Sequence, residues 1–391
     1  MEQKIIIIGG GIAGLSAAQA ARETDPGADI RLVCGEKRLP YYRTRICGLL
    51  SGDDPQKLPV RNEQWFADQR IEVVFASATF VHPDKKRVLF SDGSYLPYDK
   101  LVLATGARGV MPDFEGSDRP NVVPLRGLAD IEKIQAIPGP AVVIGNGVLG
   151  MEAAWHLSRQ GRGVVMVGRG RQLLSRQLDK EGSNFLLNLT ERAGVRVALR
   201  GQLAVVDEGL ALLADGRGFD AGVVVIAAGA RSDMRLAKKL GLECGRGIVV
   251  DAHMRTGADN IWAAGDCVEF NGRAGGQWTV AMAQGAVAGC GAAGGEKLYV
   301  PERQAFSLNV MDTYVWSSGE LTAEDRAVWK DSEAGIFQTL FFEEEALVGA
   351  ELIGDVSQSL ALKKALAQGM GRTQALAAFG KDRNNDEGEE G

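Results

Sequence analysis

The stretch IIIIGGGIAG, from Ile5 to Gly14, decides the fold of this chain. Four consecutive β-branched residues are typical of a strand that is buried on both faces of a parallel sheet. They lead directly into the glycine pattern G-x-G-x-x-G and then into an alanine-rich, helix-like stretch. In this pattern the first glycine makes the turn, the second admits a pyrophosphate, and the third lets helix and strand pack closely. The segment therefore predicts a strand-turn-helix unit that binds a dinucleotide.

The same unit occurs a second time in the chain. Residues 141–150 are AVVIGNGVLG, again a buried strand with the glycine pattern, and the helix-like MEAAWHLSRQ follows. Each unit then returns to a second apolar strand, at residues 30–34 and at residues 164–167. A further pair, YDKLVLATGA (98–107) and FDAGVVVIAAGA (219–230), predicts buried strands that end in small-residue turns, each after a hairpin-like Asp-Gly. The repeat predicts two βαβ dinucleotide-binding domains.

The pattern changes towards the C-terminus. Alternating apolar residues in SLNVMDTYVW, GIFQTLFF and ALVGAELI, followed by the helical SQSLALKKALAQG, predict a small antiparallel sheet with a helix. We therefore expect an α/β protein with two Rossmann-like domains and a small C-terminal α+β domain. The predicted boundaries are 1–112 with 244–297 for a discontinuous first domain, 113–243 for the second, 298–380 for the third, and 381–391 for a disordered acidic tail.

Composition narrows the class of protein. The chain has 391 residues with 51 glycines but only 12 prolines, so collagen-like and Pro/Gly-rich disordered chains are excluded. Its net charge is −6, and the tail 381–391 carries five acids and two bases, so the folded part is close to neutral. This balance gives no globally basic footprint for a nucleic acid. The apolar run from Ile5 to Ala21 resembles a signal peptide only in part, because the start MEQK is barely basic, and we expect no transmembrane helix.

Cysteines and histidines give no sign of a metal site. The five cysteines are odd in number and contain no C-x-x-C pair, which argues against a disulfide framework and a cysteine-rich metal site. The three histidines, His82, His156 and His253, are scattered along the chain without clustered acids. We therefore expect no metal and a reducing compartment, the cytoplasm.

The residues after each second strand predict which nucleotide binds. Glu36 is an acid suited to accept hydrogen bonds from a ribose, which fits the adenosine half of FAD. In the second unit Gly168 stands where an acid specific for NADH would stand, and Arg169 and Arg171 follow. Two arginines without that acid favour the 2′-phosphate of NADPH. The alternative is that both arginines are ordinary surface residues of a loop.

Several further motifs accompany the two glycine patterns. They are Glu36-Lys37, Tyr41-Tyr42-Arg43, Ala104-Thr105-Gly106, Glu152 after Gly150, Ala264-Gly265-Asp266, and Ala281 with Gln284-Gly285. Over residues 1–375 the chain resembles the flavoproteins with two dinucleotide-binding domains. Within them it resembles the rubredoxin-reductase-like branch, with ferredoxin reductases and the flavin part of nitrite reductases.

The resemblance implies an activity and roles for individual residues. It implies that NAD(P)H reduces a bound FAD, which passes electrons to a small redox protein such as rubredoxin or an iron–sulfur protein. It also implies that Asp266 binds the ribityl–phosphate region of FAD, that Arg43 contacts its pyrophosphate, and that Glu152 lies near the nicotinamide–flavin junction. The alternative for Glu152 is an exposed acid in the first turn of the helix, where the helix dipole favours it.

Together these arguments predict two sets of binding residues. For FAD they are Gly9, Gly10, Gly11, Ile12, Ala13, Gly14, Glu36, Lys37, Arg43, Ala78, Ala104, Thr105, Gly106, Arg108, Gly265, Asp266, Val280 and Ala281. For NAD(P)H they are Gly145, Asn146, Gly147, Val148, Leu149, Gly150, Glu152, Arg169, Arg171, Ala228 and Gly229.

Three departures from the family pattern leave alternatives open. After the Tyr-Tyr-Arg element the family continues R-P-x-L-S-K, whereas residues 43–48 here are RTRICG. Asn309 stands where the family has a lysine, and Ser232-Asp233 replaces a Pro-Asn pair.

Cys47, followed by Gly48, imitates the Cys-Gly pair of peroxidase and oxidase relatives, in which a thiolate cycles through sulfenic acid. Those relatives lack the Tyr-Tyr-Arg arginine. The alternative functions are therefore a peroxide or oxygen reductase that uses Cys47, or a flavin-binding redox-sensing scaffold. Trp278 is predicted either to pack against the flavin or to bury its ring.

Overall fold

The computed structural model describes residues 2–275, 277–302 and 304–380, so the predicted acidic tail lies outside the described residues. The chain forms two compact units, and each is discontinuous in sequence. The first unit runs to Val110 and resumes over Ala230–Pro301, and the second comprises Met111–Gly229 and the chain from Glu302. Residues 230–243, expected in the second domain, belong to the first unit, because β17 (Ala230–Ser232) pairs with β8 (Ala107–Gly109). The division into three domains stays a prediction.

The first unit is built on a five-stranded parallel sheet in the order β19-β7-β1-β2-β3. In the central strand Ile5, Ile6 and Ile7 are at most 1% exposed, as expected for a strand covered on both faces. The strands are β1 (Lys4–Ile8), β2 (Asp29–Val33), β3 (Ile71–Val74), β7 (Lys100–Leu103) and β19 (Ile261–Ala263).

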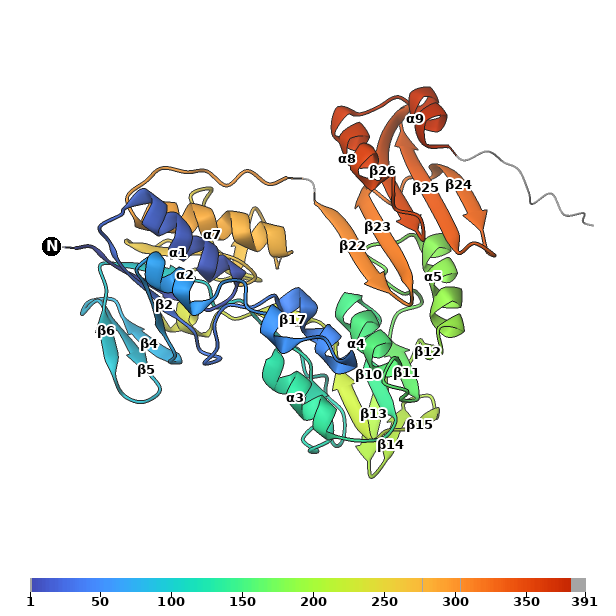
Figure 1. Cartoon of the computed structure of the whole chain (residues 1–391), viewed down its shortest axis with the longest axis horizontal. Helices are drawn as coiled ribbons and strands as arrows, with labels where there is room; N and C mark the ends of the chain where they lie inside the picture. The colour runs from blue at the N-terminus through green and yellow to red at the C-terminus, as the bar shows by residue number, and fades with distance from the viewer. Residues whose placement is uncertain (1, 276, 303, 381–391) are drawn as a thin grey trace, which may run out of the picture. The chain divides into compact units, whose positions relative to one another are not determined.

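Helices α1 (Ile12–Thr24) and α7 (Trp278–Ala292) lie side by side against this sheet (Figure 1). Two glycines of α7 permit this approach: a Cβ atom on Gly285 or Gly289 would overlap the backbone carbonyl of Ala13 or Ala17 in α1. The close pairing of the helices therefore depends on the absence of side chains at these two positions.

Smaller elements complete the first unit. An antiparallel meander is formed by β4 (Ala78–His82), β5 (Arg87–Phe90) and β6 (Tyr95–Pro97). A second small sheet contains β18 (Ile248–Val249), β20 (Val268–Phe270) and β21 (Arg273–Ala274). The helical segments are η1 (Arg43–Ser51), η2 (Pro55–Lys57), α2 (Glu63–Asp68) and α6 (Arg235–Lys239).

The second unit repeats the architecture of the first. Its parallel sheet has the order β12-β11-β10-β16-β9, which matches β3-β2-β1-β7-β19, and a three-stranded meander again precedes the strand beside the centre. The sheet strands are β9 (Val122–Pro124), β10 (Ala141–Ile144), β11 (Val164–Gly168), β12 (Val195–Leu199) and β16 (Val223–Ile226). The meander is β13 (Leu203–Asp207), β14 (Leu210–Leu213) and β15 (Gly218–Asp220), and the helices are α3 (Leu128–Ala136), α4 (Val148–Ser158) and α5 (Lys180–Arg192). The predicted repeat is confirmed.

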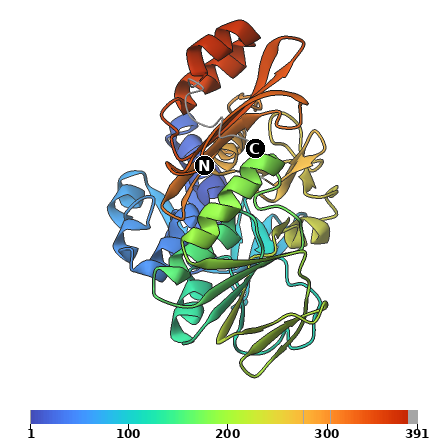
Figure 2. The same cartoon turned by 90° about the vertical axis from the view of Figure 1, so that its right-hand side faces the viewer.

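The C-terminal part of the second unit is an antiparallel sheet in the order β22-β23-β26-β25-β24. Helix α8 lies against one face of this sheet and α5 against the other (Figures 1 and 2). Leu340 and Leu352 pack with Leu362 of α8, whereas Phe337 stacks on Phe185 of α5 at 5.4 Å. The elements are β22 (Ala305–Val310), β23 (Thr313–Gly319), β24 (Asp325–Asp331), β25 (Ile336–Glu343), β26 (Ala346–Ile353), α8 (Ser359–Gln368) and α9 (Arg372–Phe379). The predicted sheet with a helix is confirmed.

A buried acid lies where this C-terminal sheet meets α5. Glu351 is 0% exposed, and its Oε2 accepts a hydrogen bond from the backbone N–H of Asp179 at 2.9 Å. Burial, together with the nearby Asp179 carboxylate, raises the pKa of Glu351 to about 9. Asp179 also caps α5 at Gly182 and pairs with Arg326. Glu351 is therefore protonated at neutral pH inside this junction.

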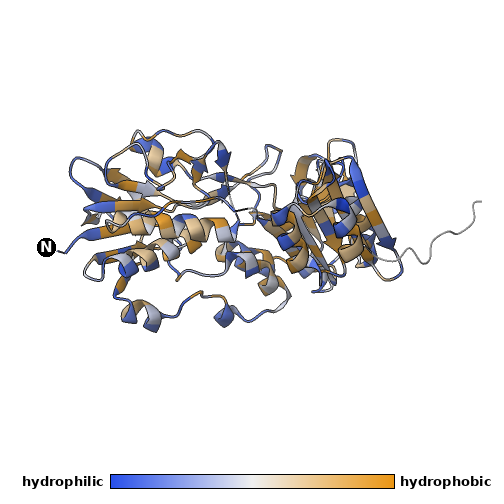
Figure 3. Ribbon diagram, turned by 90° about the horizontal axis from the view of Figure 1, so that it is seen from above, coloured by the Kyte–Doolittle hydropathy of each residue, from blue (hydrophilic) through white to orange (hydrophobic). Residues whose placement is uncertain are grey.

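Apolar residues gather on the strands and on the helix faces that cover them, whereas the connecting loops are largely hydrophilic (Figure 3). Within the described ranges, no helix is both long enough and apolar enough to cross a bilayer.

Candidate cofactor and nucleotide sites

The glycine loop between β1 and α1 is shaped by contacts at two of its glycines. Gly9 has a φ of +130°, and a Cβ atom there would overlap the carbonyl oxygen of Ala104. A Cβ atom on Gly14 would overlap the carbonyl oxygen of Gly9. On Gly11, in contrast, a Cβ atom would meet nothing within 4 Å. The open space lies where α1 begins without a side-chain cap, which fits a bound pyrophosphate.

The loop between β10 and α4 has the same three-part geometry. Gly145 has a φ of +137°, and a Cβ atom there would overlap the carbonyl oxygen of Ala227. Gly150 packs in the same way on Gly145, whereas a Cβ atom on Gly147 would meet nothing within 4 Å. α4 also begins without a side-chain cap. Both loops therefore fit a dinucleotide, one in each unit.

The Tyr-Tyr-Arg element surrounds the acid that is predicted to bind the FAD ribose. The Tyr41 hydroxyl donates to Glu36 Oε2 at 2.6 Å, and the Arg43 guanidinium pairs with Glu36 Oε1. Burial alone would lower the pKa of Arg43, but the neighbouring Tyr41, Glu36 and Asp266 raise it. The structure thus brings together three residues that the sequence assigns to FAD, at Glu36, Arg43 and Asp266.

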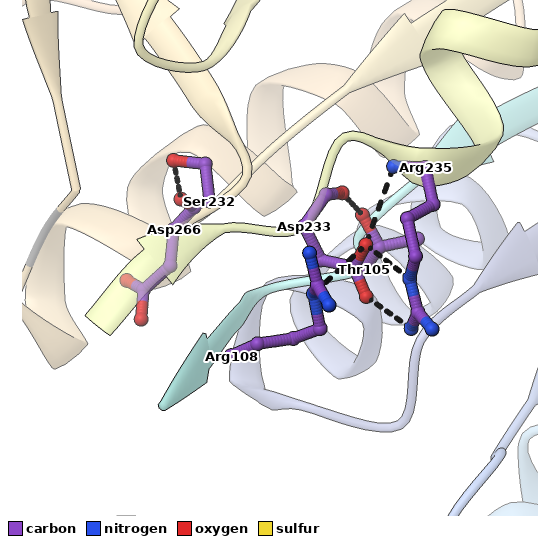
Figure 4. A network of polar contacts seen from close by, with 6 residues as sticks. All are labelled: Thr105, Arg108, Ser232, Asp233, Arg235 and Asp266. Carbon is purple, nitrogen blue, oxygen red and sulfur yellow. Dashed lines mark hydrogen bonds and ion pairs between the residues drawn. The ribbon is translucent and has the colours of Figure 1, made fainter. Parts of the chain in front are cut away.

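The turn after β7 is held by Ser232-Asp233, the pair that replaces the Pro-Asn of the family pattern. Thr105 Oγ1 donates to the backbone oxygen of Asp233 at 2.7 Å, and the Asp233 carboxylate pairs with Arg235 at 2.6 Å and with Arg108 at 3.7 Å (Figure 4). Burial raises the pKa of Asp233, but the hydrogen bonds and charge of Arg235, with the charge of Arg108, lower it overall. The charge of Arg108, predicted to serve FAD, is therefore shared with a buried aspartate.

The Ser232-Asp233 pair also contacts the Gly265-Asp266 turn. Ser232 Oγ donates to the backbone oxygen of Asp266 at 2.7 Å (Figure 4). Gly265, with a φ of +83°, donates its N–H to the buried Gln284 Oε1 of α7 at 3.0 Å. These bonds hold the backbone that presents the Asp266 carboxylate.

An aromatic pair in the first unit was not foreseen. Trp278, at the start of α7, stacks on Tyr42 with ring centroids 5.4 Å apart and an interplanar angle of 24°. The guanidinium of Arg45 lies over the other partner, 5.3 Å from the Tyr42 ring centroid. Trp278 is half-buried, and Val280 and Ala281, both predicted to contact FAD, follow it in the same helix.

The other residues predicted for FAD all lie in the first unit. Ile12 and Ala13 open α1, Lys37 has a φ of +54° in the turn after β2, and Ala78 begins β4. Ala104, Thr105 and Gly106 form the turn after β7.

Cys47 lies in η1 and is only 2% exposed, with Gly48 packed closely on Asp53. None of the five cysteines is paired in a disulfide. Burial and, to a smaller extent, the charge of Glu36 raise the pKa of Cys34 to about 12, and burial also raises the pKa of Cys267. Neither Cys34 nor Cys267 is therefore a thiolate at neutral pH.

Three arginines surround the loop after β11. Arg169 and Arg171 are exposed, and no ion pair joins either of them to an acid among the described residues. Arg200, exposed and with a φ of +56°, donates its backbone N–H to the oxygen of Gly170 at 3.1 Å. Arg200 was missed because it lies far along the sequence, after β12.

Glu152 lies in α4 and is half-buried. Burial raises its pKa to about 7. Ala228 and Gly229 follow β16, and Gly229 has a φ of +100°. The role of Glu152 beside the nicotinamide stays a prediction.

His82 lies in β4, His156 in α4 and His253 in a loop. The described residues contain no group of three or more His, Cys, Asp or Glu that could hold a metal ion.

Comparison with known proteins places the chain. A protein-family model described as "Pyridine nucleotide-disulphide oxidoreductase" matches residues 3–285. A second family model, "Rubredoxin NAD+ reductase C-terminal domain", matches residues 305–370. The benzene 1,2-dioxygenase system ferredoxin–NAD(+) reductase subunit of Pseudomonas putida is 33% identical over 291 residues, 71% of this chain and 70% of that protein. The NADH-rubredoxin oxidoreductase of Clostridium acetobutylicum is 29% identical over 373 residues, 93% of this chain and 94% of that protein.

A solved structure extends this likeness to three dimensions. A ferredoxin reductase from Rhodopseudomonas palustris superposes with a TM-score of 0.88 at 26% identity, covering 96% of this chain and 97% of that one. The sequence matches, the repeated sheets and the two open glycine loops all indicate a protein with two dinucleotide-binding units. The chain therefore belongs to the pyridine nucleotide-disulphide oxidoreductase family and is an NAD(P)H-dependent flavoprotein oxidoreductase.

Proposed function

We propose that this protein passes electrons from NADPH, through bound FAD, to a small redox protein such as rubredoxin or an iron–sulfur protein. The observation that carries the proposal is the pair of glycine loops. Each has its second glycine, Gly11 or Gly147, facing open space at the start of a helix. Two such loops in separate units supply one site for a flavin and one for its electron donor.

When bound, FAD accepts two electrons as hydride and releases them one at a time. The chain's own residues bind and orient. Gly11 and the N-terminus of α1 would receive the pyrophosphate, Glu36 would accept hydrogen bonds from the ribose hydroxyls, and Arg43 and Asp266 would hold the middle of the dinucleotide. Arg43 and Tyr41 fix the Glu36 carboxylate before the ribose arrives.

The kind of acceptor is argued from the relatives. One is named a ferredoxin–NAD(+) reductase subunit and another an NADH-rubredoxin oxidoreductase, and the C-terminal sheet matches the rubredoxin reductase C-terminal domain. A small one-electron carrier is therefore the acceptor we propose. None of the five cysteines is paired in a disulfide, which supports the predicted cytoplasmic location.

The preference for NADPH rests on the loop after β11. Arg169 and Arg171 lack acidic partners among the described residues. The backbone N–H of Arg200 donates to Gly170 in the same loop. A hydrogen bond to a charged group contributes about 1.5–3 kcal/mol, which corresponds to roughly one to two decades in affinity. Their charges are therefore available to a 2′-phosphate.

Substitution of both loop arginines tests the preference. In Arg169→Ala with Arg171→Ala, the Kd for NADP+ should rise by roughly ten- to a hundred-fold while the Kd for NAD+ stays constant. Both constants are measured by titration of the FAD-loaded protein. The exposed Arg61 of the first unit, changed to alanine, is the matched control. An equal loss for both nucleotides would make the two arginines bystanders.

Glu152 is proposed to sit beside the nicotinamide and to favour its oxidised, cationic form. Because the pKa of Glu152 is about 7, its carboxylate is charged mainly above that pH. The affinity for NADP+ should therefore rise as the pH increases through 7, and Glu152→Gln should remove this rise. A pH profile of the Kd for NADP+ that is the same in both proteins would contradict the role.

A further inference from the structure

The two glycine loops solve one steric problem in opposite ways. In the first unit Gly10 faces the residue that follows β2, and a Cβ atom on Gly10 would lie 2.6 Å from Cys34 Sγ and 3.1 Å from Cys34 Cβ. In the second unit the loop residue is Asn146, and it faces Gly168 at the end of β11. At each place only one of the two facing positions carries a side chain.

The second contact leaves no room for a side chain at Gly168. A Cβ atom there would lie 2.5 Å from Asn146 Cγ, 2.7 Å from its Nδ2 and 2.8 Å from its Cβ. Rotation of the Asn146 side chain moves the amide but leaves Cβ in place, because Cβ is fixed by the backbone. The overlap therefore persists in every rotamer of Asn146.

Asn146 also holds the loop that carries the arginines. Its Nδ2 donates to the backbone oxygen of Gln172 at 2.5 Å, and its own backbone oxygen accepts from the N–H of Leu174 at 3.1 Å. On the other side, the oxygen of Gly168 accepts from Gly201 at 3.0 Å. Hydrogen bonds from one asparagine thus anchor the end of the segment that contains Arg169 and Arg171.

We propose that Asn146 is a specificity-determining positioning residue, which excludes a ribose-binding acid at position 168 and fixes the arginine loop for a 2′-phosphate. The inference rests on the proposed nucleotide site and adds the residue that sets its selectivity. It changes the interpretation of Gly168, because the absence of an acid there follows from the side chain at position 146. Removing the side chain at position 146 and placing an acid at position 168 should therefore change which nucleotide binds.

Four variants test the coupling: Gly168→Asp, Asn146→Gly, the two combined, and Gly168→Asp with Asn146→Ala. Each is measured as FAD-loaded protein for thermal unfolding and for the Kd of NADP+ and NAD+. Gly168→Asp alone should lower the unfolding temperature and weaken both nucleotides at least tenfold. Asn146→Gly alone should weaken NADP+ several-fold, because the loop loses its anchor.

The combined Gly168→Asp and Asn146→Gly variant should recover the unfolding temperature and bind NAD+ at least tenfold more tightly than Asn146→Gly alone. The version with Asn146→Ala should not recover, since alanine keeps the Cβ atom that causes the overlap. The inference would be overturned if the effects of the two substitutions on the unfolding temperature were additive. It would also be overturned if Gly168→Asp alone had the unfolding temperature of the unchanged protein.

If Gly168→Asp does not fold, Gly168→Ala with and without Asn146→Gly gives the same comparison with a smaller side chain. The unfolding temperatures need no nucleotide, so they separate this inference from the proposed preference for NADPH. Coupled unfolding with unchanged nucleotide selectivity would overturn the specificity role. The preference for NADPH itself is tested separately, by the Arg169→Ala, Arg171→Ala variant.

Discussion

The two nucleotide-binding units share strand order and glycine-loop geometry, but they treat the residues after their second strands differently. In the first unit Glu36 is fixed by Tyr41 and Arg43, so its carboxylate is oriented without a ligand. In the second unit the backbone of the loop is anchored, whereas the charged groups of Arg169 and Arg171 have no ion-pair partner in the described chain. The glycine pattern thus specifies a dinucleotide, and the strand end specifies which one.

The largest effect should come from filling the open space of each loop separately. A Cβ atom on Gly11 or Gly147 meets nothing within 4 Å, so Gly11→Ala and Gly147→Ala should both fold. Gly11→Ala should lose most of its FAD, because the pyrophosphate needs that space. Gly147→Ala should keep FAD and lose affinity for NADP+ at least tenfold.

Flavin absorbance per protein gives the first readout, and nucleotide titration gives the second. Circular dichroism serves as the control for folding. Loss of FAD in Gly147→Ala with retention in Gly11→Ala would reverse the assignment of the two units.

The facing pair of the first unit should be as sensitive as that of the second. Gly10→Ala brings a Cβ atom against Cys34, and such overpacking costs about 1–3 kcal/mol of unfolding free energy. Addition of Cys34→Gly should restore part of this loss by removing the thiol. Denaturant unfolding of the apoprotein measures both variants, and equal stability of Gly10→Ala and the unchanged protein would refute the contact.

Buried charge also distinguishes the second unit. The pKa of Glu351 is about 9 in the folded protein, above its ordinary value near 4.3 in an unfolded chain. The folded state therefore holds a proton that the unfolded state releases, and this contribution to stability is present below about pH 4 and is lost as the pH rises through 9. Across that window the unchanged protein should lose stability relative to Glu351→Gln as the pH rises.

Unfolding temperatures of the two proteins between pH 5 and pH 9 measure this difference. A parallel pH dependence in both proteins would mean that Glu351 is already ionised in the junction between α5 and the C-terminal sheet.

The smallest effect should come from Cys47→Ser. Cys47 is 2% exposed, and the family resemblance carried by Tyr41-Tyr42-Arg43 implies electron transfer without a thiol. Reduction of an iron–sulfur acceptor by NADPH should therefore change by no more than a few-fold. If the substitution abolishes every NADPH-dependent activity while FAD stays bound, the peroxidase or oxidase alternative is the better one.

The repeated sheets and both glycine loops could be predicted from the sequence, because strand burial and G-x-G-x-x-G are local patterns. Asn146 against Gly168, and Trp278 against Tyr42, could not, because each contact joins residues that are distant in sequence and carries no motif. Glu351 was also missed, since its strand shows ordinary apolar alternation and its partner Asp179 lies in another domain of the prediction. Local patterns thus predicted the binding units, and tertiary contacts determine their selectivity.

The central claim is that electrons pass from NADPH, through FAD held by the first unit, to a small redox protein. Anaerobic stopped-flow mixing of the FAD-loaded protein with NADPH, then with oxidised rubredoxin or ferredoxin, tests it most directly. Bleaching of the flavin should be faster with NADPH than with NADH at equal, subsaturating concentration, and reoxidation should require the added carrier and reduce it. Flavin that is reduced but passes no electrons to either carrier, while reacting rapidly with peroxide or oxygen, would contradict the account.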